Sequence, residues 1–253
     1  MPRPRTKFLV RHVVEADKHP FVGRIFDLSI VELWFETYDA LVASPDRKYA
    51  IEVNATLSML VARVGSLNLI GDMIWPVPMP STFEGFPISR YDWLVIAADA
   101  FLMRYISVVD CAALLVNEVY QCGLAPHNCS IERLRKIDVP PETLHILQAM
   151  RSDQGNLRPE RNARVHRGIE RGFTSDPISF QLAARSERHG IEMTGEGADD
   201  RPLSVSRSFK EGLVELQGDF NRSSRVLSLR LKGLYDVLLR AFESRFNQLR
   251  AQD

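Results

Sequence analysis

Hydrophobic residues recur every three to four positions along most of this chain, and strictly alternating strand patterns are scarce. This spacing aligns apolar side chains along one side of a helix, so it predicts an all-α fold. Candidate helices cover residues 26–43, 49–75, 89–122, 130–137, 141–151, 158–171, 176–189 and 209–249. In residues 89–122 the apolar positions surround most of the helix, as expected for the centre of an antiparallel helical bundle. Gly123 is suited to stop that helix.

The chain divides into three parts by sequence pattern. Residues 1–24 are basic and contain Pro2, Pro4 and Pro20, which predicts a tail or an irregular lead-in. Residues 25–190 are predicted to form the bundle. Residues 191–253 begin with a polar, glycine-containing loop and continue as a long helix that packs on the bundle or on a partner.

Composition excludes several classes of protein. The 32 basic and 32 acidic residues cancel, so any contact with nucleic acid must come from a local basic patch. Cys111, Cys122 and Cys129 lack the spacing of a zinc site, which favours reduced thiols and predicts neither a metal nor a cofactor. The most apolar stretch, residues 93–119, carries several charges, and no signal-length apolar run follows the basic start. We therefore expect a cytoplasmic protein with no membrane contact.

A local positive patch lies late in the chain, between residues 151 and 171. It contains six arginines and three acidic residues, Asp153, Glu160 and Glu170; the arginines are Arg151, Arg158, Arg161, Arg164, Arg167 and Arg171. The guanidinium group is a forked donor suited to phosphate. His166 lies among these arginines and can exchange a proton near neutral pH. Together these groups can bind a phosphodiester and move the proton of a neighbouring hydroxyl.

Helical geometry limits how one copy of this segment can act. Asn162 and His166 are four residues apart and share a face. Arg161 and His166 are five apart, which separates them by roughly 140° around the helix axis. One helix therefore does not direct both side chains at the same atom with ease. A groove between two symmetry-related copies can do so, which predicts a homodimer.

The sequence Arg161-Asn162-x3-His166, late in an all-helical chain, resembles the Arg-x4–6-His signature of the HEPN superfamily. HEPN domains are helical bundles of toxin–antitoxin, abortive-infection and CRISPR-associated systems, and many are metal-independent RNases that act as dimers. The resemblance implies an all-α, HEPN-type bundle with extra flanking helices. It also implies RNA as substrate and, for a toxin or antiviral defence effector, an antitoxin or other regulatory protein as partner.

On this resemblance Arg161 and His166 hold the catalytic positions, and Asn162 holds the polar position beside the arginine. Three neighbouring arginines are candidates for RNA phosphate binding, namely Arg158, Arg164 and Arg167. The helix over residues 89–122 resembles the one that often supplies a further polar residue, and its candidates are Ser107, Asp110 and Asn117.

Simpler interpretations remain open from sequence. His166 is also compatible with an exposed helical histidine, and the arginines with a solvated face paired to Glu160 and Glu170. Ser107, Asp110 and Asn117 share a stripe, so they can satisfy one another within the bundle. Beside the RNase, the sequence allows a non-catalytic HEPN-like module that binds RNA, a nucleotide or a protein, and a purely structural helical interaction protein.

Overall fold

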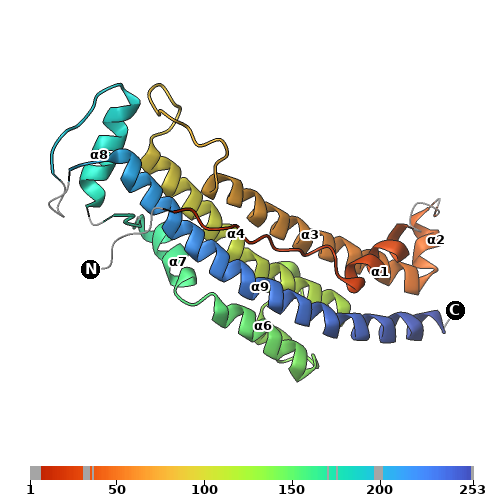
Figure 1. Ribbon diagram of the computed structural model, residues 1–253. Helices are drawn as coiled ribbons and strands as arrows, with labels where there is room; N and C mark the ends of the chain where they lie inside the picture. Colours follow the sequence, from red (N-terminus) through yellow and green to blue (C-terminus); the bar gives the residue numbers. More distant parts are fainter. Residues whose placement is uncertain are drawn as a thin grey trace. The chain divides into compact units, whose positions relative to one another are not determined.

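Helices make up most of the computed structural model, which describes residues 7–30, 35, 37–169, 171–174, 176–196 and 202–251 (Figure 1). Within these residues no strand forms, and the sole β-pairing is an isolated bridge between Glu196 and Pro202. The all-α prediction is confirmed. The helices are α1 Pro20–Ser29, α2 Tyr38–Val42, α3 Pro45–Ile74, α4 Arg90–Val119, α5 Ile131–Leu134, α6 Pro141–Asp153, α7 Leu157–Arg167, α8 Pro177–Arg188 and α9 Val205–Arg250, with a 3-10 turn η2 at Pro126–Asn128.

The predicted helix over residues 26–43 is wrong in its bounds. The structure has two helices there, α1 and α2, and part of the interval, residues 31–34 and 36, lies outside the described residues. α1 begins earlier because Pro20 fits a first helical turn and the His19 ring accepts a hydrogen bond from the Phe21 N–H. α2 begins where the Thr37 hydroxyl accepts one from the Ala40 N–H. Two local caps therefore replace one continuous helix.

Two compact units divide the chain, and each is assembled from three separate segments. Unit 1 contains residues 1–13, 67–103 and 156–224, and unit 2 contains residues 14–66, 104–155 and 225–253. The three long helices α3, α4 and α9 contribute residues to both units. The division predicted from sequence, with boundaries after residues 24 and 190, therefore differs from these two units. Helical periodicity carries no information about which helices meet, so it does not predict units built from separate segments.

Unit 1 has a core of buried aromatic side chains. Phe83 and Phe209 meet edge to face with ring centroids 5.5 Å apart, and Phe101 and Phe220 lie 5.7 Å apart. The Arg90 guanidinium lies over the Phe83 ring and pairs with Glu187 at 2.9 Å. This ion pair connects the first turn of α4 to the last turn of α8.

Unit 2 is centred on α9 residues that pack against α1 and α3. Phe242 stacks on Tyr49 at 5.1 Å, and Tyr235 lies 5.6 Å from Phe21. The Tyr49 hydroxyl donates to the Val119 carbonyl at the end of α4. α3 is also the one described helix long and apolar enough to cross a membrane, a criterion that the core helix of a globular protein can equally meet.

Glu118 of unit 2 gives a prediction about pH. Burial, with a smaller contribution from Glu52, raises the pKa of the Glu118 carboxyl. A raised pKa in the folded state means that stability is greatest below the unfolded pKa and falls as the pH rises through the folded value. Glu118→Gln should therefore raise the thermal midpoint at pH 7 and change it little at pH 4. Calorimetry at both pH values measures this, and an equal gain at each would contradict it.

Candidate functional site

The predicted motif lies on α7, which belongs to unit 1. Three sequence features delimit this helix: Pro159 in its first turn, Gly168 after its last residue and a basic C-terminal turn. Gly168 has φ +63°, and its N–H donates to the Arg164 carbonyl. A residue with a side chain resists this left-handed conformation, so Gly168 ends the helix two residues after His166.

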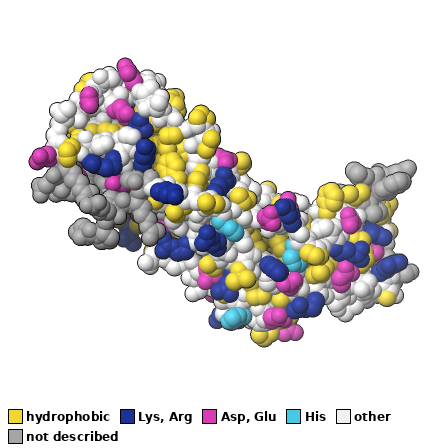
Figure 2. Space-filling view, viewed as in Figure 1, with side chains coloured by type: hydrophobic (Ala, Val, Ile, Leu, Met, Phe, Trp, Pro, Cys, Tyr) yellow, Lys and Arg dark blue, Asp and Glu magenta, His cyan; other side chains and the backbone are white. Residues whose placement is uncertain are grey.

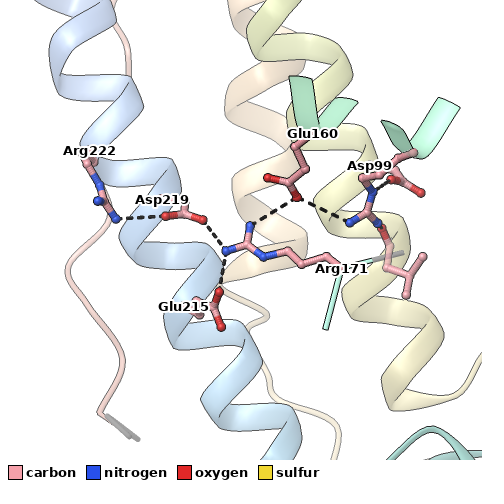
Figure 3. Close-up of polar contacts among 8 residues, drawn as sticks. Asp99, Glu160, Arg171, Glu215, Asp219 and Arg222 are labelled. Atoms are coloured by element: carbon pink, nitrogen blue, oxygen red, sulfur yellow. Dashed lines mark hydrogen bonds and ion pairs between the residues drawn. The ribbon is translucent and has the colours of Figure 1, made fainter. Parts of the chain in front are cut away.

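An ion-pair network holds the motif segment against the rest of unit 1 (Figure 3). Arg164 pairs with Asp99 of α4 and, at 3.7 Å, with Glu160 one turn earlier in α7. Arg171, just beyond α7, binds Glu215 at 2.5 Å and Asp219 at 2.7 Å on α9. The Glu160 carboxylate lies between both guanidinium groups and so links the two attachments.

This network holds two of the six arginines in the patch, Arg164 and Arg171, although the Arg164 Nη1 atom makes no hydrogen bond. The Arg164 side chain is 5% exposed and that of Arg171 is 17% exposed. Hydrogen bonds to Asp219 and Glu215 raise the pKa of Arg171 against the opposing effect of burial, so this group stays charged. A third arginine, Arg151, pairs with Glu132 in unit 2. Both residues belong to unit 2, so the patch predicted from sequence is divided between the two units.

Arg164 is therefore bound to carboxylates of its own chain. The sequence suggested a phosphate contact for this residue, whereas the geometry favours a role in positioning α7 on α4. Figure 2 shows a similar mixture of charges on one face of the molecule, where basic and acidic side chains lie interspersed.

Arg161, Asn162 and His166 have a different environment. Asn162 and His166 are exposed, and Arg161 is half-buried. The Arg161 Nε atom is buried and has no hydrogen-bond partner among the described residues. A buried donor without an acceptor carries a free-energy cost, and the Arg164 Nη1 atom is likewise buried without a hydrogen-bond partner. Arg167 is exposed, and the described part of the chain offers it no ion pair.

The remaining candidates fall into two groups. Arg158 lies in α7 and is half-buried, with a partner of its own. Ser107, Asp110 and Asn117 belong to unit 2. The Ser107 hydroxyl donates to the Arg104 carbonyl of its own helix. Asn117 is 7% exposed and both donates to the Leu124 carbonyl and accepts from the Leu124 N–H, which holds the turn after α4.

Sequence reasoning missed the acidic partners of the motif segment. Asp99, Glu215 and Asp219 lie on two other helices, 44 or more residues away from the arginines that they bind. No local spacing predicts such pairs. Within the described residues, no three His, Cys, Asp or Glu side chains gather as metal ligands.

Comparison with known proteins gives no relative: no family model, curated protein or solved structure matches this chain.

The positioning role of Arg164 has a measurable consequence. Arg164→Ala removes charge-assisted hydrogen bonds that are worth about 1–3 kcal/mol, and a loss of that size should lower the thermal midpoint by roughly 2–12 °C. Arg167→Ala is the matched control from the same turn, because Arg167 is exposed; its midpoint should stay within about 1 °C. Thermal unfolding of both variants measures this. Equal midpoints would show that the pair with Asp99 does not hold α7.

Proposed function

We propose that this chain is a metal-independent endoribonuclease of the HEPN kind. The observation that carries the proposal is the contrast within α7. Arg164 pairs with Asp99 and Glu160 of the chain itself, whereas the half-buried Arg161 has no ion pair among the described residues and His166 is exposed five residues later. The segment therefore offers one cation and one proton-transfer group for a ligand. The resemblance of Arg161-Asn162-x3-His166 to the HEPN signature supplies the reaction class.

The reaction uses the 2′-hydroxyl of RNA as nucleophile. His166 accepts the hydroxyl proton while the 2′ oxygen bonds to phosphorus, and the bond from phosphorus to the 5′ oxygen breaks. The leaving 5′ oxygen takes a proton from water, so one product ends in a 2′,3′-cyclic phosphate and the other in a 5′-hydroxyl. Arg161 binds the phosphoryl oxygens and stabilises the negative charge that develops on them. Asn162 donates a hydrogen bond beside the arginine, and Arg158 and Arg167 bind flanking phosphates.

The proposal includes a homodimer in which two copies of α7 form one site. Since five residues separate the motif's Arg and His around the helix, two copies of α7 across a two-fold axis serve one phosphate more readily than one copy does. A protein of this type acts in the cytoplasm, and a regulatory protein that covers the α7 face would restrain it.

The test is incubation of the purified chain with RNA in EDTA, beside an Arg161→Ala/His166→Ala double variant. We expect cleavage by the unmodified chain alone, with cyclic phosphate ends, and none when the RNA is replaced by its 2′-deoxy analogue. Retained binding without cleavage would identify a non-catalytic module instead. Absence of both would leave a structural helical protein and contradict the proposal.

A further inference from the structure

Residues near the start of the described chain are held on unit 1 by main-chain hydrogen bonds and by the side chain of Arg11. Residues 8–12, which we call the strap, lie in an extended, non-helical conformation. The Gln217 side chain of α9 accepts a hydrogen bond from the Leu9 N–H at 2.8 Å. One turn later, Asn221 accepts from the His12 N–H at 2.7 Å and donates to the Val10 carbonyl at 2.9 Å. The Trp75 indole N–H donates to the Leu9 carbonyl at 2.6 Å.

The two amides that bind the strap are built into the core of unit 1. Gln217 is 0% exposed and Asn221 is 6% exposed. Gln217 also donates to the Ile74 carbonyl at the end of α3, which fixes the orientation of its amide. If the strap left, Asn221 would lose both of these bonds and Gln217 one, at positions where an unmade hydrogen bond is costly. This surface is therefore matched to an occupant that presents main-chain N–H and C=O groups.

One side chain of the strap, that of Arg11, lies close against α3. Arg11 bonds to the Asp72 carboxylate and to the Asn68 carbonyl of α3. Its guanidinium lies over Gly71, where an added methyl group would overlap it. Gly71 is thus the residue that lets an arginine approach the helix backbone.

Two of the three apolar side chains of the strap are exposed, and the third, Leu9, is half-buried. Phe8 is 38% exposed and Val10 is 89% exposed. Since apolar burial is the main source of local stability, a segment held mainly by polar contacts can open without the rest of the unit. Main-chain recognition also tolerates other sequences, as when an extended peptide joins a sheet edge.

We propose that the surface formed by Gly71, Asp72, Trp75, Gln217 and Asn221 is a binding site for an extended polypeptide segment that carries an arginine. Residues 8–12 occupy this site in cis, and an extended segment of a partner protein with an arginine at the position of Arg11 takes their place when the strap opens. The proposal is independent of RNA cleavage.

The first test measures opening of the strap by native-state hydrogen exchange in the full chain. Gly71→Ala displaces the Arg11 guanidinium, so the Leu9 and His12 amides should exchange about 10- to 100-fold faster, the factor for a charge-assisted hydrogen bond. Gly65→Ala is the matched control on the same helix, because a methyl group there meets nothing within 4 Å. It should leave both amides unchanged. Exchange of these amides in the unmodified chain solely through global unfolding would overturn the proposal.

The second test measures binding in trans. The full-length chain with residues 8–12 replaced by glycine and serine should bind a fluorescent peptide of residues 7–14. N-methylation of the peptide at Leu9 and His12 should abolish binding, and so should Arg11→Ala, whereas Val10→Lys should have no effect. A folded replacement chain that ignores the peptide, or that binds the N-methylated form equally, would overturn the proposal. If the replacement chain does not fold, the exchange measurement decides.

Discussion

His166→Ala is expected to slow RNA cleavage by about 10²- to 10⁴-fold, the usual contribution of a positioned acid or base. RNA affinity should stay nearly unchanged, because a neutral imidazole adds little to phosphate binding. His166 is exposed near the end of α7, with Gly168 closing the helix behind it, so its removal should not disturb the fold. Single-turnover rates and dissociation constants, measured on the same RNA, separate the two effects.

His145→Ala is the matched control for this variant. His145 is likewise an exposed helical histidine, but it lies on α6 in unit 2. It should cleave at the unmodified rate and with the unmodified pH profile. If His166→Ala also cleaves at that rate, the mechanism is wrong whatever the fold.

Sequence periodicity predicted most helices of this chain to within a few residues. It succeeded for α3, α4, α6, α8 and α9 because each has an apolar face long enough to dominate the pattern, and because Pro141 and Pro177 occupy first turns. It failed over residues 26–43, where apolar spacing continues past Ser29 but the caps at His19 and Thr37 define two short helices. Local hydrogen bonds overrode periodicity at that point.

The pairing of elements was beyond prediction from this one sequence. Gln217 and Asn221 are polar residues on a buried face of α9, and nothing nearby in the sequence identifies the strap, more than 200 residues away, as their partner. The same holds for Arg164, whose charge was readable but whose partner Asp99 is 65 residues away. Counting the arginines between residues 151 and 171 therefore overestimates how many of them can bind a ligand.

Arg161→Ala is expected to damage both the rate of cleavage and RNA affinity, which distinguishes it from His166→Ala. Loss of a charge-assisted contact to phosphate should weaken binding by about 1.5–3 kcal/mol, roughly 10- to 100-fold. Its contribution to the transition state should lower the rate by a further ~10²-fold or more. Arg161→Lys should restore little, because an ammonium group lacks the forked geometry of the guanidinium. Arg167→Ala, by contrast, should mainly weaken binding and reduce its dependence on salt.

The two inactive variants together test whether one phosphate is served by two chains. If Arg161 of one chain works with His166 of the other, a dimer of one Arg161→Ala chain and one His166→Ala chain has one complete site and one that lacks both groups. Random mixing makes half of the dimers mixed, so about a quarter of the unmodified activity should return. Coexpression and a cleavage assay measure this, with sedimentation confirming the dimer. A mixture as inactive as its components would exclude this pairing, and sedimentation as an active monomer would assign both groups to one chain.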